Sequence, residues 1–126
     1  IFSNNKAKLI IENILHPMIA REVGTETRLA KSPYVIQVIP LWVEKNKTSR
    51  SNIWKLLVVD CFEKIQKQRA INRSSIDAST FNKIKLNQVS RLSRIKLADY
   101  VIDNNGTIDT LEPQVSKIHN LLLKDL

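Results

Sequence analysis

The sequence of 126 residues contains few of the residues that mark secreted, metal-binding or membrane-spanning proteins. Its single cysteine, Cys61, cannot form an intramolecular disulfide bond, and no second cysteine or clustered histidine stands beside it at metal-ligand spacing. No apolar run approaches the roughly 20 residues of a membrane-spanning helix, and the first residues lack the pattern of a secretory signal. We therefore expect a cytoplasmic protein whose cysteine is buried and unreactive.

Glycine and aromatic residues are also scarce. Gly24 and Gly106 are the only glycines, so the sequence contains no Gly-x-x-x-x-Gly-Lys-Ser/Thr loop, which holds nucleotide phosphates with its backbone amides. Aromatic residues make up 6% of the chain. Phe62 and Phe81 are the only ones in its most basic segment. Because single-stranded nucleic acids stack their bases on such rings, this scarcity argues against base recognition.

Positive charge is abundant and unevenly distributed. The formal net charge is +8, and residues 62–98 hold nine Lys or Arg against two acids, a net of +7, whereas residues 99–126 are net acidic. A polyanion would be drawn to the middle of the chain. The alternative to polyanion binding is that these charges form a solvated helical surface with no binding role. With so few stacking rings, phosphate binding without base reading fits better than nucleic-acid binding.

The spacing of apolar residues predicts helices at the start of the chain. Residues 4–31 are expected to form two helices, with Ser3 or Asn4 as the first N-cap. The two helices should meet at His16 and Pro17, because proline disfavours a helical residue before it and suits the first turn of a new helix. A histidine at such a junction is more often structural than a ligand contact.

Three short apolar runs predict strands. The run "PYVIQVIPLWV" at 33–43 indicates a strand buried on both faces, entered by Pro33 and closed by Pro40. The run "KLLVVD" at 55–60 indicates a second such strand, and a polar loop over residues 44–52 joins the two. The stretch "DYVIDNNG" at 99–106 indicates a short strand that ends in a turn. The hydrophobic content of 43% is enough for a sizeable buried core.

Helical patterns follow the second strand and end the chain. Asp77 and Ser90 are placed to cap two of these helices, and Pro113 falls in the first turn of the last one. The basic segment is expected to hold helices over 62–73, 78–88 and 91–98. Buried strands between helices predict an α/β layer architecture, in which the basic segment is an appendage over a site.

The stretch "QKQRAINR" carries the clearest candidate site residues. Gln66, Arg69 and Arg73 fall at i, i+3 and i+7, on one side of about two helical turns. Guanidinium groups meet phosphate oxygens in a two-pronged geometry that lysine cannot reproduce. The two arginines therefore predict an anion site, whereas packing or capping is the expected role of Gln66 and of Gln88.

The motifs, taken in order, resemble the C-terminal portion of bacterial dephospho-CoA kinases. The resemblance is carried by "ENILHPMI", "SPYVIQVIPLWVE", "LLVVD", "QKQRAINR", "NQVSRLSRIKLADYVIDNNG" and the final helix. It implies a three-layer α/β/α P-loop kinase-like fold, here with an incomplete core. It also implies a helical acceptor-binding region at 1–32, core strands at 33–61, a helical lid at 62–98, and a last core strand and helix at 99–126.

The same resemblance implies the activity and the residues that carry it. Such enzymes transfer the γ-phosphoryl group of ATP to the ribose 3′-hydroxyl of dephospho-CoA, the last step of coenzyme A biosynthesis. The resemblance makes Arg69 and Arg73 catalytic and places them on the ATP phosphates, with Asn104 and Gly106 beside the adenine. On spacing alone, Asn105-Gly106 is at least as well explained as a plain turn. The residues placed at the acceptor pocket are His16, Pro17, Pro40, Leu41 and Glu44.

The resemblance also indicates what these residues do not supply. The phosphate-binding loop, the general base and the Mg²⁺ ligands are expected before Ile1, so the chain by itself is expected to be an inactive C-terminal fragment. We expect ATP and dephospho-CoA as partners, and neither nucleic acid nor a membrane. The alternative is a basic helical module that binds nucleic acid through its phosphates, recognised by a steep loss of affinity with salt.

Overall fold

The computed structural model describes residues 5–45, 53–74, 76–86 and 88–126. The predicted cap at Ser3 or Asn4 and most of the predicted loop at 44–52 lie outside this part of the chain. The chain divides into two compact units, 1–38 and 39–126. The finer, four-part division predicted from the sequence stays a prediction.

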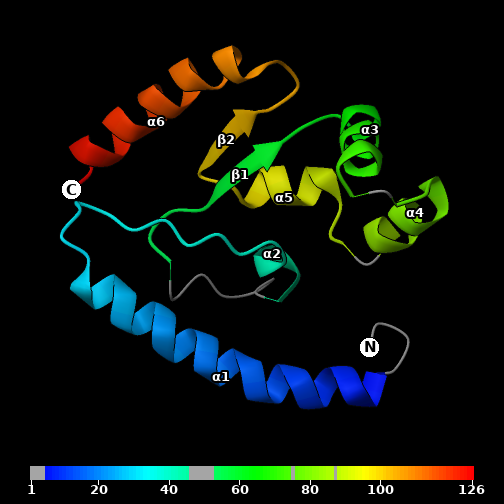
Figure 1. The fold of residues 1–126 in the computed structure, drawn as a ribbon. Helices are drawn as coiled ribbons and strands as arrows, with labels where there is room; N and C mark the ends of the chain where they lie inside the picture. The colour runs from blue at the N-terminus through cyan, green and yellow to red at the C-terminus, as the bar shows by residue number, and fades with distance from the viewer. Residues whose placement is uncertain (1–4, 46–52, 75, 87) are drawn as a thin grey trace. The chain divides into compact units, whose positions relative to one another are not determined.

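The first unit consists mainly of one long helix, α1 (Asn5–Leu29), and not of the two helices predicted from the sequence (Figure 1). Pro17 lies inside this helix. A proline removes one hydrogen bond and crowds the carbonyl group one turn earlier, at Asn13. The turns on either side keep their own hydrogen bonds, so α1 continues through the proline and the predicted break at His16 is wrong.

The apolar run at 33–43 does not form the predicted strand. Residues 34–39 have no regular secondary structure, and the side chains of Ile36 and Val38 are 69% and 86% exposed. A strand is held by hydrogen bonds to a neighbouring strand. Within the described residues the only paired strands are two others, so β-propensity alone does not make this run a strand.

The second unit begins with a turn at Pro40 and Leu41, followed by the short helix α2 (Trp42–Lys45). Its sheet consists of two parallel strands, β1 (Leu57–Asp60) and β2 (Tyr100–Asp103), as the sequence predicts. Because parallel strands require a crossover connection, the intervening segment returns the chain to the start of the sheet.

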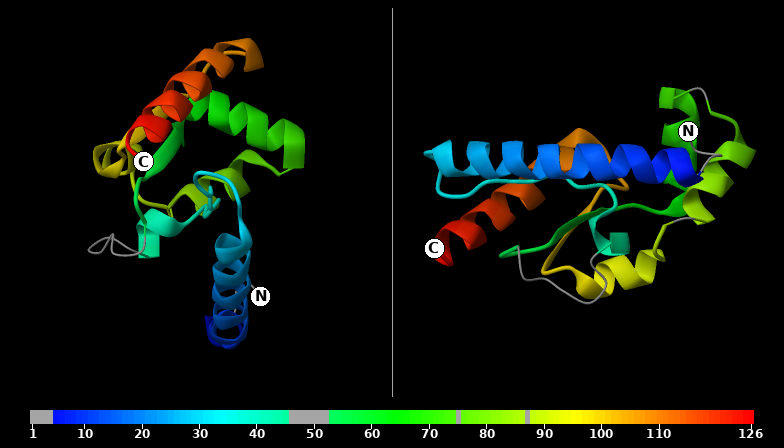
Figure 2. Two further views of the ribbon diagram at one scale, coloured as in Figure 1. Left: turned by 90° about the vertical axis from the view of Figure 1, so that its left-hand side faces the viewer. Right: turned by 90° about the horizontal axis from the view of Figure 1, so that it is seen from below.

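Helices lie on both sides of these strands. Figures 1 and 2 show α5 and α6 on opposite sides of the pair, α5 against β1 and α6 against β2. The sheet is nevertheless only partly covered, because Val59 is 58% and Leu57 36% exposed. The prediction that β1 is buried on both faces is therefore wrong, since two strands present too little surface for two full layers of helices.

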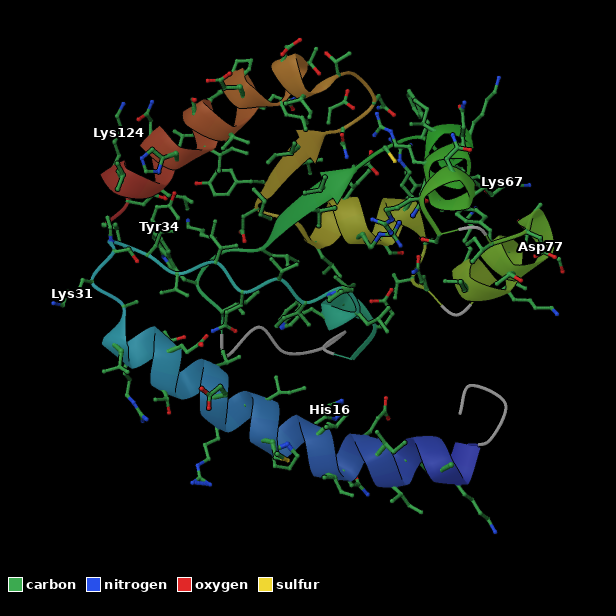
Figure 3. The ribbon with its side chains drawn as sticks, in the orientation of Figure 1. His16, Lys31, Tyr34, Lys67, Asp77 and Lys124 are labelled. Atoms are coloured by element: carbon green, nitrogen blue, oxygen red, sulfur yellow. The ribbon has the colours of Figure 1, made fainter. Side chains whose placement is uncertain are left out.

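The basic segment forms the three helices that the sequence predicts. They are α3 (Glu63–Ser74), α4 (Ala78–Leu86) and α5 (Arg91–Leu97). The Asp77 side chain accepts a hydrogen bond from the Thr80 amide, and Ser90 accepts one from the Ser93 amide, so both predicted N-caps are confirmed. The Thr80 amide also lowers the pKa of Asp77. Figure 3 shows Asp77 at the start of α4.

The chain ends in a 3-10 turn, η1 (Ile108–Thr110), and helix α6 (Glu112–Lys124), which carries Pro113 in its first turn as predicted. Little of the described chain is fully buried. The buried hydrophobic residues are Val43, Phe81 and Ile102. The sizeable core expected from the composition is not present in the described residues, because most apolar side chains of the helices remain exposed.

Because the core is small, we can predict how strongly a buried and an exposed residue of β2 each contribute to stability. Ile102 is 7% exposed on β2, whereas the adjacent Val101 is 40% exposed. Ile102→Ala should lower the free energy of unfolding by about 2–5 kcal/mol through lost contacts and a cavity, and Val101→Ala by less than about 1 kcal/mol. Urea unfolding of the two variants measures the difference. Equal losses would show that Ile102 is not a core residue.

Candidate functional site

The carboxyl ends of β1 and β2 meet at one edge of the sheet and carry the densest polar network of the described chain. The register pairs Asp60 with Asp103. Beyond Asp103 the chain turns through Asn104–Gly106. The backbone N–H of Asn104 donates to the backbone carbonyl of Asp60 at 2.8 Å. In open α/β sheets this is the edge at which ligands bind.

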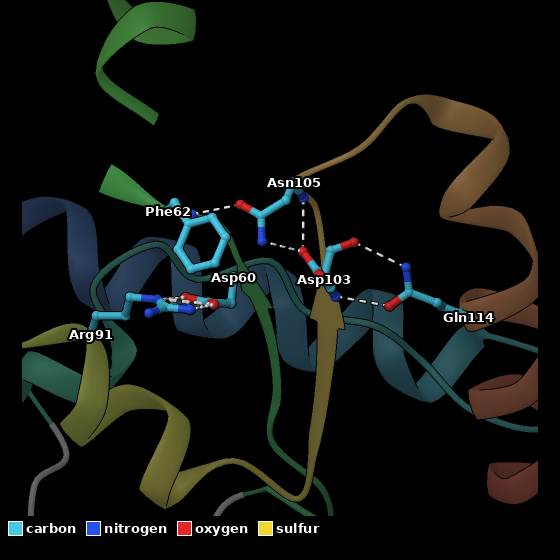
Figure 4. A network of polar contacts seen from close by, with 6 residues as sticks. All are labelled: Asp60, Phe62, Arg91, Asp103, Asn105 and Gln114. Carbon is cyan, nitrogen blue, oxygen red and sulfur yellow. Dashed lines mark hydrogen bonds and ion pairs between the residues drawn. The ribbon is translucent and has the colours of Figure 1, made fainter. Parts of the chain in front are cut away.

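Asp60 is the buried charge of this edge, at 8% exposure. Arg91, the first residue of α5, donates from Nε to both carboxylate oxygens at 2.8 and 3.0 Å and from Nη2 to Oδ2 at 2.6 Å. The hydrogen-bonded carboxylate raises the pKa of Arg91. The guanidinium carbon also lies 5.0 Å from the centre of the Phe62 ring, at cation–π distance (Figure 4).

The turn after β2 is fixed by side-chain amides. Asn105 accepts a hydrogen bond from the Phe62 amide at 2.7 Å and donates to Asp103 (Figure 4). Gln114 on α6 holds both backbone groups of Asp103, at 2.8 and 2.9 Å. Gly106 permits a close approach, because a Cβ atom there would lie 2.5 Å from the Thr110 hydroxyl oxygen.

Arg69 joins helix α3 to this turn. Its Nη1 donates to the Asn104 carbonyl at 2.6 Å and its Nη2 to the Gly106 carbonyl at 2.8 Å. Three of the four residues predicted to bind ATP, namely Arg69, Asn104 and Gly106, are thus brought together. Arg73 follows one turn later on α3 with an exposed side chain, and no partner for it lies among the described residues.

A small pocket opens beside the Asp60–Arg91 pair, with a volume of about 80 Å³. Two of its cationic side chains have partners within the protein, since Lys85 pairs with Glu63 and the Arg94 guanidinium donates to the Val89 carbonyl. The lining residues are Cys61, Glu63, Gln66, Lys85, Gln88, Val89, Ser90, Arg91 and Arg94. Cys61 is half-buried there, so the expectation that it is buried is wrong.

The five residues predicted for the acceptor pocket fall in both units. His16 and Pro17 lie on α1 in the first unit and are exposed (Figure 3). In the second unit, Pro40 and Leu41 form the exposed turn before α2, not the carboxyl end of a strand. Glu44 accepts a hydrogen bond from the Val89 amide at 3.0 Å. Their role in acceptor binding stays a prediction.

Four residues of this network were not singled out as site residues from the sequence: Asp60, Arg91, Asn105 and Gln114. Asp60 carries a usable signal, because a charged residue that ends an apolar strand sits at the ligand-binding edge. No local pattern indicates that Arg91, 31 residues further on, is its partner. That pairing is a property of the tertiary fold alone.

The described carboxylates do not fit a metal site. No group of three or more His, Cys, Asp or Glu among the described residues is arranged to hold a metal ion. Asp60 is held by Arg91 and Asp103 by Asn105. Among the same residues, no helix is long and apolar enough to cross a membrane.

Comparisons with known proteins identify the family and the fold. The family model of dephospho-CoA kinase matches residues 1–110. The chain is 40% identical over 119 residues to a dephospho-CoA kinase of Nitrosospira multiformis, covering 94% of this chain and 59% of that protein. It is 35% identical over 119 residues to the Shigella flexneri dephospho-CoA kinase, covering 94% of this chain and 57% of that protein.

Two solved structures have a similar fold. A protein of Thermus thermophilus superposes with a TM-score of 0.82 at 23% identity, over 96% of this chain and 62% of that one. The dephospho-CoA kinase of Campylobacter jejuni superposes with a TM-score of 0.59 at 24% identity, over 99% of this chain and 63% of that one. The expected P-loop kinase-like fold with a partial core is thereby confirmed.

The chain belongs to the dephospho-CoA kinase family. It spans less than two thirds of the length of the curated relatives that it matches.

The Asp60–Arg91 pair yields a prediction about stability. Arg91→Met leaves a buried carboxylate without its partner, so we expect it to lower the free energy of unfolding, although solvent partly screens the pair because the Arg91 side chain is 40% exposed. Urea unfolding of Arg91→Met, Asp60→Asn and the double variant measures the coupling, with Lys96→Met on the same helix as control. Strictly additive losses would contradict the pairing.

Proposed function

We propose that the protein to which these residues belong transfers the γ-phosphoryl group of ATP to the ribose 3′-hydroxyl of dephospho-CoA. The observation that carries the proposal is the meeting of Arg69 with the Asn104–Gly106 turn at the carboxyl edge of two parallel strands. Membership of the family names the substrates. The arrangement supports a nucleotide at this edge, with its base near the turn and its phosphates toward α3.

The chemistry explains why arginines on α3 suit this reaction. Phosphoryl transfer requires mainly positioning and neutralisation of charge on the transferred group. A guanidinium group on this helix supplies positive charge to the phosphates without any proton transfer, because arginine stays protonated at every physiological pH. The net charge of +7 over residues 62–98 adds a field that attracts ATP and the anionic acceptor.

Other residues serve the remaining parts of the reaction. Residues 62–98 act as the lid over ATP, and His16, Pro17, Pro40, Leu41 and Glu44 contribute to acceptor binding. Mg²⁺ accompanies ATP, although the described carboxylates do not supply its site. With Gly24 and Gly106 as its only glycines, this sequence contains no loop that could cradle the β- and γ-phosphates with backbone amides.

The direct test compares the 126-residue chain with the product of the same gene expressed from its natural start codon. We expect the gene product to release ADP from ATP only when dephospho-CoA is present, and to form coenzyme A in equal amount. The 126-residue chain by itself should release none, because it has no phosphate-binding loop. Coupled detection of ADP together with chromatography of the acceptor measures both products.

Failure of the gene product to phosphorylate dephospho-CoA would contradict the proposal. A salt titration with single-stranded nucleic acid, run on both proteins, would then test the alternative of a phosphate-binding basic module. That module predicts a linear fall of log affinity with log salt concentration and no effect of ATP.

A further inference from the structure

The Arg69 side chain is hydrogen-bonded to the backbone of the turn after β2. Two of its guanidinium nitrogens each donate to a carbonyl, one at Asn104 and one at Gly106. Arginine has five N–H donors in a fixed planar fork, so this pair of bonds sets the separation and direction of the two carbonyl groups. The side chain therefore constrains the shape of the turn and does not merely contact it.

The turn is held at two further points, the end of β1 and the residue before α3. The backbone N–H of Asn104 donates to the backbone carbonyl of Asp60 at 2.8 Å. The side-chain oxygen of Asn105 accepts a hydrogen bond from the backbone N–H of Phe62 at 2.7 Å. These bonds hold the beginning of the turn. Arg69 is the group that holds its far end, because the described structure gives the Gly106 carbonyl no other hydrogen-bond donor.

Arg73 is in a different position although it lies on the same helix. It is four residues further on, which is about 6 Å along the helix axis. Its side chain is exposed, and no hydrogen-bond or ion-pair partner lies among the described residues. Its guanidinium is therefore available for a bound anion, whereas that of Arg69 is already engaged by two carbonyls.

We propose that the two arginines have separate tasks. Arg69 is a positioning residue that shapes the Asn104–Gly106 turn and thereby the recognition of the adenine base, and Arg73 contacts the phosphates. This inference rests on the proposed function. It differs from the sequence-based expectation that both arginines face the phosphates, and it follows from the bonds that Arg69 makes to the turn.

The test measures ATP and GTP as phosphoryl donors for the gene product expressed from its natural start codon, with dephospho-CoA as acceptor. Arg69→Ala should raise the KM for ATP by about tenfold and reduce the preference for ATP over GTP, with kcat changed little. Arg73→Ala should lower kcat and leave the preference unchanged. Lys64→Ala, an exposed cation on the same helix, is the control and should resemble the wild type.

Two further variants separate a positioning role from a general loss of structure. Arg69→Lys can reach one carbonyl at a time, so it should restore part of the preference for ATP. Gly106→Ala disturbs the turn without touching Arg69, because its new Cβ would meet the Thr110 hydroxyl oxygen at 2.5 Å. It should therefore reproduce the altered base preference of Arg69→Ala. Circular dichroism confirms that each variant is folded.

Three results would overturn the inference. The first is a fall in kcat for Arg69→Ala with an unchanged preference between ATP and GTP, which would place Arg69 on the phosphates. The second is a lowered melting temperature with unchanged KM, kcat and preference, which would make Arg69 merely structural. The third is a wild-type protein without ATP-dependent phosphorylation of dephospho-CoA, which would remove the proposed function itself and is recognised before any variant is made.

Discussion

The arrangement of the site depends on the burial of one negative charge at the end of β1. A carboxylate that is 8% exposed is costly unless it is paired, and Asp60 is paired by three short bonds from Arg91. Its backbone carbonyl also accepts the amide that starts the turn after β2. Asp60 thus connects helix α5, the sheet edge and the turn, so the geometry of all three is linked.

Polar contacts at the carboxyl edge of the sheet position the candidate site, although the core is only partial. Few apolar side chains are buried in the described residues, so polar contacts do much of the positioning. Gln114 on α6 holds β2, Asn105 holds Phe62 just before α3, and Arg69 in the middle of α3 holds the turn after β2. These contacts join β2 to α6 and the turn after β2 to α3, so side-chain hydrogen bonds between elements fix the geometry of the carboxyl edge.

The sequence predicts local features of this structure well and long-range ones poorly. The three basic helices and the caps at Asp77 and Ser90 are confirmed, because each depends on neighbouring residues. β1 and β2 are also confirmed, because each has the other as its hydrogen-bonded partner. The strand predicted between Pro33 and Pro40 is wrong, since strand formation requires a partner that local sequence does not specify. Arg69 is predicted as a site residue, but its bonds to Asn104 and Gly106 follow only from the tertiary fold.

The central claim is that the turn after β2 forms the base-binding end of a nucleotide site. The most direct measurement is the change in backbone amide resonances when ADP is added to the isotope-labelled gene product expressed from its natural start codon. The account predicts that the largest shifts in the second unit occur at Asn104, Asn105 and Gly106. Unchanged resonances at these residues, with binding detected elsewhere in the protein, would contradict it.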